Sequence, residues 1–281
     1  MLIGFIGQGF IGKSYADDFE RRGFSVVRYA LEEPYVQNKE AIKTCDVVFV
    51  AVPTPTKHDT GFDDSIVRSA LGLVGEGNIA VIKSTILPGT TERLQKEFPK
   101  ITVLHSPEFL SEATAAEDAA HPVFNIIGVP EGDVRGREAA ERVMATLPQA
   151  GYSTICTARE AELFKYLRNC FFYTKVVYMN LLYDVAQVLG ADWSALRAIL
   201  ARDPWIAEKH LDPVHKSGRG AGGNCFVKDF AAFAQIYASL LPADEEGLTL
   251  LKALENKNIA LLRESGKGLE QIRAVYGVTG D

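Results

Sequence analysis

The sequence is poor in cysteine, and its few cysteines stand far apart. Only four occur in 281 residues, namely Cys45, Cys156, Cys170 and Cys225, and no two of them form a CxxC pair. A chain of this length does not need disulfides to stabilise its core, and zinc sites and dithiol redox motifs need closely spaced cysteines. We therefore expect reduced thiols, a cytoplasmic location and no metal site.

An excess of positive charge and long apolar runs are also missing. The net charge is −6, which disfavours nucleic-acid binding because phosphate contacts need clustered lysine and arginine. The N-terminal stretch MLIGFIGQGFIGKSYADDF has no basic segment and no apolar run long enough for a signal peptide or a membrane span. The sequence thus predicts neither a nucleic-acid partner nor membrane association.

What the first half of the chain does contain is an alternation of strands and helices. Residues 2–6 form an apolar run, residues 13–22 have a helical pattern, and FSVVRY follows as a second strand. Further short apolar strands lie in CDVVFVAVPTP, NIAVIKSTILPG, KITVLHSPEF and FNIIGVP, with a helix in DDSIVRSALGLV. This order predicts an α/β fold, a Rossmann-like doubly wound parallel sheet over residues 1–157.

The second half has a different character. Residues 157–189 contain neither glycine nor proline and are apolar on nearly every helical face, which predicts one helix far longer than the usual length of about 11 to 12 residues. Further helices are expected at 193–201, 226–240 and 244–264, with a poorly anchored tail over the last dozen residues. We predict an all-helical second domain over residues 158–281 and a homodimer that forms through it, because its apolar faces need cover.

Three glycines follow the first predicted strand. Gly7, Gly9 and Gly12 form GxGxxG, a spacing that permits a tight turn, close approach of a pyrophosphate and helix packing. A purely steric strand end is the alternative. Ala30 occupies the position where an acid usually binds the ribose hydroxyls. Glu32 or Glu33 can replace that acid, and Arg28 instead suits a 2′-phosphate, so NAD is preferred over NADP only modestly.

Polar residues gather at predicted strand ends and on the long helix. Lys165 and Asn169 are four residues apart, so they emerge on one helical face and suit an oxyanion or a substrate hydroxyl. From these two residues alone, a pair of solvated side chains is the favoured interpretation. Glu108, Glu112 and Thr85 follow strands, where open α/β sheets bind their ligands.

The stretch GRGAGGNCFVKD places a cysteine after several glycines. Glycines at 218, 220, 222 and 223 precede Cys225, and Lys228 and Asp229 follow it. The glycines let the backbone approach a ligand, and Lys228 or Lys165 can stabilise a thiolate, which is a potent nucleophile. A buried small hydrophobic side chain is the alternative for a lone cysteine, but the glycines and the Lys-Asp pair favour the nucleophile.

Taken together, GxGxGGxCxxKD, SPEFLSEATA, AELFKYLRN, VPTPT and STILPGTT resemble the UDP-glucose/GDP-mannose 6-dehydrogenase family of nucleotide-sugar dehydrogenases. The similarity extends from residue 1 to about residue 262, with the motifs in the family's order. PEFL is more similar to the glucose and mannose enzymes than to those for N-acetylated sugars. Members normally continue into a third, UDP-binding domain, so the resemblance implies a short form that lacks this C-terminal domain.

The resemblance also implies a mechanism. In a four-electron oxidation of a C6 hydroxyl with NAD, Cys225 traps the aldehyde as a thiohemiacetal, which is oxidised to a thioester and hydrolysed to the uronic acid. Lys165 and Asn169 would hold the oxyanion, and Asp229, Thr85 and Glu108 would position water and move protons. NAD would be bound by Gly7, Gly9, Phe10, Ile11, Gly12, Glu32, Pro53, Thr54, Thr85, Glu112 and Lys228. The sugar nucleotide would be bound by Phe109, Leu110, Ser111, Lys165, Asn169, Lys216, Gly218, Arg219 and Gly222.

Several positions depart from the family pattern. Arg219 replaces a neutral residue, Trp205 replaces an arginine, and Val123-Phe124 replaces Asp-Arg. Arg219, Lys216 and His215 then either bind the diphosphate or are solvated loop charges. Two other functions stay open: a two-electron dehydrogenase of the β-hydroxyacid type, which does not need the cysteine, and a non-catalytic relative that binds a nucleotide sugar.

Overall fold

A computed structural model of the chain describes residues 1–216 and 218–277. Its internal contacts divide it into two compact units. Unit 1 comprises Met1–Thr54 and Asp63–Lys165, and unit 2 comprises Pro55–Phe62 and Tyr166–Asp281. The predicted domain boundary after residue 157 stays a prediction.

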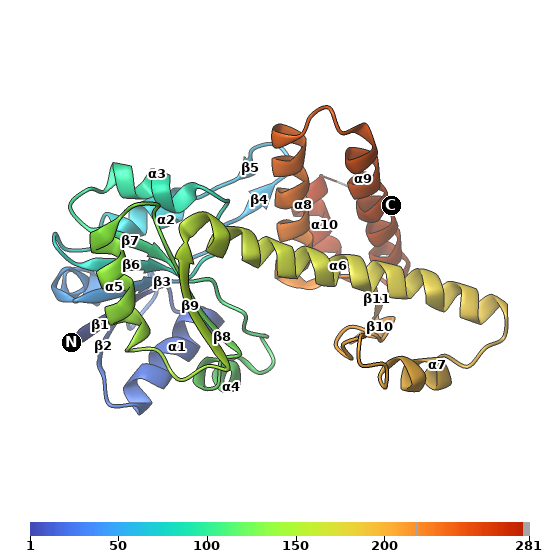
Figure 1. Cartoon of the computed structure of the whole chain (residues 1–281), viewed down its shortest axis with the longest axis horizontal. Coiled ribbons are helices and arrows are strands. Elements are labelled where there is room, and N and C mark those ends of the chain that lie inside the picture. The colour runs from blue at the N-terminus through green and yellow to red at the C-terminus, as the bar shows by residue number, and fades with distance from the viewer. Residues whose placement is uncertain (217, 278–281) are drawn as a thin grey trace. The chain divides into compact units, whose positions relative to one another are not determined.

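Unit 1 is built on a seven-stranded sheet in the order β2-β1-β3-β6-β7-β8-β9 (Figure 1). The strands are β1 (Leu2–Ile6), β2 (Ser25–Tyr29), β3 (Val47–Val50), β6 (Ile79–Ile82), β7 (Thr102–His105), β8 (Phe124–Val129) and β9 (Tyr152–Thr157). All neighbours pair in parallel except β7 and β8, which meet in antiparallel fashion at His105 and Gly128. The predicted Rossmann-like sheet is confirmed, with this one antiparallel pair added.

Helices cover the sheet because its strands are apolar on both faces. Alternate residues such as Ile3, Phe5 and Phe49 share one core with α1 (Phe10–Arg21), α4 (Ala115–Ala120) and α5 (Val134–Met144). Two other helices contact the strands, α2 (Ser65–Leu71) at β3 and α3 (Thr90–Glu97) at β7. The 3₁₀ turns η1 (Val36–Lys39) and η2 (Ala41–Thr44) lie between β2 and β3.

Unit 2 is mainly helical. It contains α6 (Ala158–Val188) from Tyr166 onward, α7 (Trp193–Leu200), α8 (Gly223–Leu240), α9 (Glu245–Glu264) and α10 (Leu269–Tyr276). The predicted long helix is thus present as the 31 residues of α6. Unit 2 also contains two small antiparallel pairs that the sequence did not suggest: β4 (Thr56–Lys57) with β5 (Gly61–Phe62), and β10 (Val214–His215) with β11 (Gly218–Arg219).

The expectation of a poorly anchored tail is wrong for the last described residues. Leu269–Tyr276 forms α10, whose Ile272 and Val275 are buried in one cluster with Val227 of α8 and Leu262 of α9. The segment β4 also contacts α8 and α10 (Figure 1). A short helix stabilised only by such packing leaves little signal in a local sequence pattern. None of the helices in the described residues is long and apolar enough to span a membrane.

Candidate active site

The predicted dinucleotide loop has the backbone that its glycines require. Gly7 has a φ of +91°, and a Cβ there would lie 2.2 Å from the carbonyl oxygen of Ala51. A Cβ at Gly12 would lie 1.9 Å from the carbonyl oxygen of Gly7, so both positions need glycine. At Gly9, the N-cap of α1, a Cβ would meet no atom of the described residues within 4 Å. The amino terminus of α1 and the open backbone beside it fit the pyrophosphate of a dinucleotide.

The end of β2 favours NAD over NADP. Arg28 does not project into solvent, because its guanidinium bonds to Glu20 at 2.7 Å and to Asp17 at 2.7 Å, both on α1. It is therefore already neutralised where a 2′-phosphate would need it. Ala30 is buried, and Glu32 lies exposed just beyond the strand. The role of Glu32 at the ribose stays a prediction.

Two of the predicted catalytic residues form a buried ion pair in unit 1. The Nζ of Lys165 donates to Oε1 of Glu108 at 2.9 Å and to the backbone carbonyl of the same residue at 2.7 Å. Both side chains are about 4% exposed. The other carboxylate oxygen of Glu108 accepts from the backbone N–H of Leu110 at 2.8 Å. The alternative of a solvated surface lysine is wrong, because burial of a charge requires a partner of this kind.

The loop after β7 is also ordered. Phe109 packs edge to face against Phe124 and Phe164, the latter on α6. The backbone N–H of Ser111 donates to Asp118 at 2.8 Å. Glu112 is exposed, Thr54 and Thr85 are buried, and Pro53 is exposed. The roles predicted for these residues at NAD or the sugar stay predictions.

A buried polar cluster beside Glu108 was missed by the sequence reasoning. The Nζ of Lys83 bonds to Oγ of Ser106 at 3.2 Å and lies 4.3 Å from the ring centre of Tyr15. Burial lowers the pKa of Lys83 to about 7, opposed by Glu108 and assisted by Lys165. Burial likewise lowers the pKa of His105 to about 3. The only sequence signal was that Lys83 directly follows a predicted strand.

In unit 2, Cys225 lies on a helix and not in a loop. It is half-buried in the first turn of α8, where exposed backbone N–H groups stabilise an anion. The expected start of this helix, residue 226, was therefore placed too late. Burial raises the pKa of Cys45 and Cys156 to about 11 and also raises that of Cys170. Of the four thiols, Cys225 is the one in the first turn of a helix, and its role as the nucleophile stays a prediction.

One turn after Cys225, Asp229 is held from two sides. Its Oδ2 accepts from Nδ2 of Asn169 at 2.6 Å, and its Oδ1 pairs with Lys228. Asn169 and Asp229 are both buried. The carboxylate and the thiol are four residues apart on α8, so they share a face of that helix. Asn169 itself follows Lys165 by four residues on the continuous helix α6.

The glycines before Cys225 are packed by the chain itself. A Cβ at Gly218 would lie 2.4 Å from Cβ of Ser265, and one at Gly222 would lie 3.1 Å from Cε of Lys267. The Nζ of Lys267 donates to the carbonyls of Gly218 and Gly220 at 3.0 Å each. Asn258 of α9 adds hydrogen bonds to both backbone groups of Ala221. These glycines therefore have an internal reason for lacking side chains, and their contact with substrate stays a prediction.

Arg219 is also engaged within unit 2. It bonds to Oδ1 of Asn180 at 2.7 Å and to Asp184 at 2.5 Å, and its guanidinium lies 5.2 Å from the ring centre of Tyr183. These three residues belong to α6, so Arg219 ties the glycine-rich segment to that helix. Lys216 is exposed. Substrate binding by Arg219 and Lys216 stays a prediction, and a diphosphate would have to compete with Asp184 for Arg219. Among the described residues, no cluster of three His, Cys, Asp or Glu suits a metal ion.

Comparison with known proteins identifies two family domains. Residues 31–147 match the NAD binding domain of the UDP-glucose/GDP-mannose dehydrogenase family, and residues 159–259 match its central domain. NAD is therefore the cofactor of this chain, in agreement with the open loop at Gly9 and the neutralised Arg28.

Individual relatives agree with this match. The UDP-glucose 6-dehydrogenase of Rhizobium meliloti is 32% identical over 209 residues, which are 70% of this chain and 47% of that protein. The UDP-glucose 6-dehydrogenase AglM of Haloferax volcanii is 27% identical over 282 residues, covering 83% of this chain and 64% of that protein. The chain thus spans about half to two thirds of the length of these curated relatives.

Solved structures show the same fold. A UDP-glucose dehydrogenase from Pyrobaculum islandicum is 28% identical with a TM-score of 0.79, over 96% of this chain and 70% of that one. A 3-hydroxyisobutyrate dehydrogenase from Mycobacterium tuberculosis has a TM-score of 0.72 over 94% of both chains, but at 16% identity it shows a similar fold only. On the two matched domains and these relatives, the chain belongs to the UDP-glucose/GDP-mannose dehydrogenase family.

Proposed function

We propose that the chain oxidises the C6 hydroxyl of a nucleotide sugar, with UDP-glucose as the first candidate, to the uronic acid in a four-electron reaction. The observation that carries the proposal is the arrangement on α8, where Cys225 lies in the first turn and Asp229, one turn later, is held by Asn169 and Lys228. The substrate class, a UDP-sugar, is taken from the two relatives named UDP-glucose 6-dehydrogenase.

In this proposal the residues have separate roles. The loop Gly7–Gly12 would hold NAD, which would supply the hydride acceptor for each of the two oxidations, one NAD molecule for each. The thiolate of Cys225 adds to the aldehyde carbon, and Lys165 and Asn169 stabilise the oxygen that becomes negative. After the second oxidation the thioester carbon is attacked by water, with Asp229, Glu108 and Thr85 positioning that water and accepting its proton. The carbon–sulfur bond then breaks and restores the thiol.

Covalent capture has a clear physical purpose. A free aldehyde can hydrate or diffuse away during the exchange of cofactor, whereas an adduct with Cys225 stays in place. The roles of Glu112 and Lys228 toward NAD, and of Phe109, Leu110 and Ser111 toward the sugar, belong to the same proposal.

The stoichiometry of the reaction tests the proposal directly. Incubation with excess NAD and limiting UDP-glucose is expected to give two NADH for each sugar consumed. The same measurement with other nucleotide sugars identifies which sugar and which base the protein prefers. One NADH per sugar would rule out the thioester step.

A two-electron dehydrogenase of the β-hydroxyacid type is the competing function, since the buried pair of Lys165 with Glu108 and the amide of Asn169 need no cysteine for it. The variant Cys225→Ser separates the two. Acid formation is expected to fall by about a thousandfold or more if the thiol is the nucleophile, whereas a hydroxyacid dehydrogenase would keep nearly all its turnover. Nucleotide-sugar binding by calorimetry with no NADH formation would instead support a non-catalytic relative.

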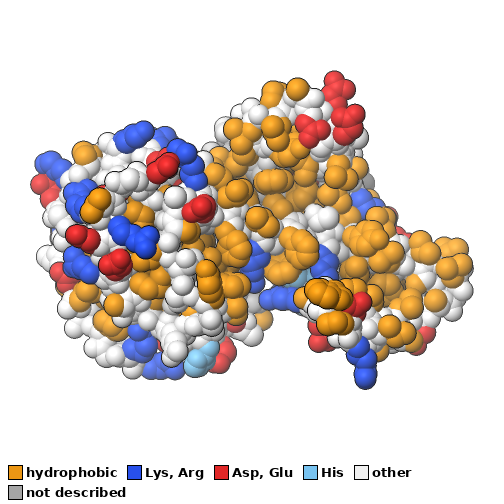
Figure 2. Space-filling model, in the orientation of Figure 1, with side chains coloured by type: hydrophobic (Ala, Val, Ile, Leu, Met, Phe, Trp, Pro, Cys, Tyr) orange, Lys and Arg blue, Asp and Glu red, His pale blue; other side chains and the backbone are white. Residues whose placement is uncertain are grey.

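We further propose a homodimer formed through unit 2 and a cytoplasmic location. Figure 2 shows hydrophobic side chains gathered over α6 and α7. The exposed apolar residues of these helices include Leu181, Val185, Val188 and Ile199, and such a surface is costly to leave in water. Sedimentation at micromolar concentration is expected to give a dimer, and Val185→Glu is expected to dissociate it. A wild-type monomer would contradict the proposal.

A further inference from the structure

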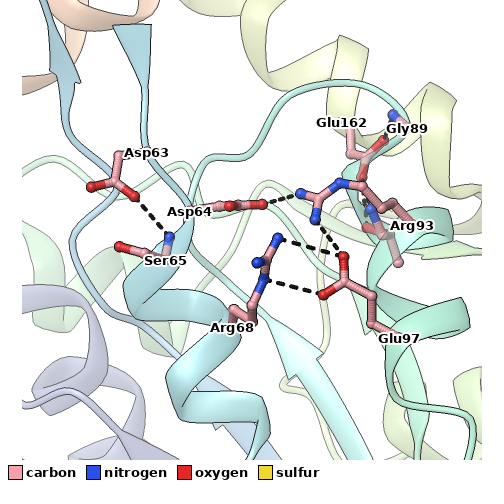
Figure 3. A network of polar contacts seen from close by, with 9 residues as sticks. Asp63, Asp64, Ser65, Arg68, Gly89, Arg93, Glu97 and Glu162 are labelled. Carbon is pink, nitrogen blue, oxygen red and sulfur yellow. Dashed lines mark hydrogen bonds and ion pairs between the residues drawn. The ribbon is translucent and has the colours of Figure 1, made fainter. Parts of the chain in front are cut away.

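Glu162, to which the sequence analysis assigned no role, is a buried carboxylate three residues before Lys165 on α6. It lies in α6 within unit 1 and is 0% exposed. Its Oε2 accepts from the backbone N–H of Gly89 at 2.5 Å, and its Oε1 accepts from the N–H of Thr91 at 2.8 Å and from Oγ1 of Thr91 at 2.6 Å. Figure 3 shows the contact between Glu162 and the Gly89 backbone.

These donors belong to the start of α3. The first N–H groups of a helix have no partner within the helix and are usually capped by the side chain of the N-cap residue. The N-cap of α3 is Gly89, with a φ of +91° and no side chain to supply that acceptor. Glu162 supplies it from 73 residues away in sequence. The cap thereby fixes α6 to α3.

The helix α3 is itself held in place within unit 1. Arg93 pairs with Asp64, the N-cap of α2, and with Glu97 at 2.9 Å (Figure 3). Glu97 also pairs with Arg68 of α2 at 3.1 Å. Since α3 is bonded to its neighbour along one side and capped by Glu162 at its start, it gives α6 a fixed point of attachment.

Lys165 follows Glu162 by three residues, so the two side chains are neighbours on the helix. The rotation of α6 about its own axis that places Glu162 on α3 therefore also determines where Nζ of Lys165 lies. That nitrogen reaches Glu108 at 2.9 Å. Ala161 of α6 packs so closely on β8 that a Cβ added at Gly128 would lie only 2.7 Å from the Cβ of Ala161. This contact limits the distance of α6 from β8, but it does not fix the rotation of α6.

The same carboxylate also holds the loop that carries Thr85. The loop runs from the end of β6 through Thr85 to Gly89, whose N–H is bonded to Glu162. Thr85 is buried, so a shift of the loop would displace its hydroxyl. Two residues with predicted catalytic roles, Thr85 and Lys165, are thus connected to one side chain.

We propose that Glu162 is a positioning residue that sets Lys165 against Glu108 and holds the Thr85 loop through the amino terminus of α3. The consequence for catalysis rests on the proposed function, whereas the positioning of Lys165 does not. A carboxylate that only stabilised the fold would cap α3 without affecting the environment of Lys165.

The test compares variants by three measurements. Glu162→Ala removes every acceptor, and Glu162→Gln keeps one oxygen. Glu160→Ala is the matched control, because Glu160 is an exposed carboxylate of the same helix turn that bonds within its own segment, to Thr157. The measurements are amide hydrogen exchange at Gly89 and Thr91, reductive methylation of Lys165 followed by mass spectrometry, and kcat and KM for NADH formation.

In Glu162→Ala, exchange at Gly89 and Thr91 and methylation of Lys165 are each expected to rise by about tenfold or more. The value of kcat is expected to fall by about a hundredfold, as for a misplaced catalytic group, while KM for NAD stays within about twofold because the Gly7–Gly12 loop is untouched. Glu162→Gln is expected to recover part of each change. Glu160→Ala is expected to stay within about twofold of the wild type throughout.

Faster exchange at Thr91 with unchanged methylation of Lys165 and unchanged kcat would overturn the proposal, since Glu162 would then be a cap alone. If Glu162→Ala does not fold, Glu162→Gln and Thr91→Val, which removes one donor, give the same comparison. If the wild type forms no NADH with any nucleotide sugar, the proposed function fails, and the methylation result still decides the positioning of Lys165.

Discussion

The two units position their polar residues by different physical means. In unit 1, Lys83 and Glu108 follow the ends of β6 and β7, and Lys165 lies on α6; all three are buried and bonded to side-chain partners. In unit 2, Asp229 is bonded to Asn169 and Lys228, but the segment before Cys225 depends on Asn258, Ser265 and Lys267 from elsewhere in the chain. In unit 1 the main free-energy cost of positioning these residues is therefore the burial of charge. In unit 2 the main cost is the ordering of the loop before Cys225.

The largest effect is expected from breaking the buried pair of unit 1. Glu108→Gln leaves the Lys165 ammonium without its counter-ion in a buried site, and stability is expected to fall by about 3 to 5 kcal/mol. Urea unfolding followed by circular dichroism measures it. The control Glu97→Gln removes partly exposed ion pairs and is expected to cost at most about 1 kcal/mol. Equal losses would show that burial does not distinguish the two sites.

Lys83 provides a test of buried charge with a defined pH dependence. Its folded pKa of about 7 lies below the usual 10.5, so between these values the unfolded chain binds more protons and stability rises with pH. Lys83→Met is expected to stabilise the chain by about 2 to 4 kcal/mol near pH 7. The gain should shrink as the pH approaches 10, and a gain independent of pH would refute the assignment.

In unit 2 the loop contacts are expected to matter more than any single charge. Lys267→Met removes the donors to the carbonyls of Gly218 and Gly220, at a cost of about 2 kcal/mol. Both tryptophans, Trp193 and Trp205, lie in unit 2, so their fluorescence reports its unfolding. Lys252→Met, at a largely exposed side chain, is the control. The rate at which Cys225 reacts with a thiol reagent should change in Lys267→Met and stay the same in Lys252→Met.

The smallest expected effect comes from two glycines before Cys225, and it distinguishes the cost of an unfavourable backbone conformation from the cost of crowding by an added Cβ. Gly220 and Gly223 have φ values of +85° and +82°, but only Gly220 has neighbours within 3.4 Å of a Cβ position, among them Leu262 and Asn258. Gly223→Ala is expected to cost about 1 kcal/mol from conformation alone, and Gly220→Ala about twice that. Equal costs in fluorescence-detected unfolding would mean that packing on the loop contributes nothing.

Much of the fold was predictable because it depends on local patterns. The strands of unit 1 are short apolar runs, and the absence of glycine and proline over residues 157–189 predicted α6. The short helix α10 was missed because the burial of Ile272 and Val275 depends on α8 and α9. The two small antiparallel pairs were missed for a similar reason, since each has strands of only two residues.

The candidate site was predictable in its residue types but not in its partners. Spacing indicated Lys165 with Asn169, and the family resemblance indicated Cys225 with Asp229, but neither predicted that Glu108 would pair with Lys165 across 57 residues. The glycines before Cys225 were interpreted as access for a ligand, whereas Ser265 and Lys267 pack against them. Such contacts join segments that are distant in sequence, and no local pattern encodes them.

The pairing of Arg28 with two acids of α1 has a consequence for redesign. Substituting Asp17→Asn and Glu20→Gln together would release a guanidinium that is now bound on both sides at the end of β2. Such a double variant is expected to bind NADP measurably better while NAD binding changes little, because an arginine there suits the extra phosphate. The coenzyme preference of this protein would then be adjustable from α1, without any change to β2.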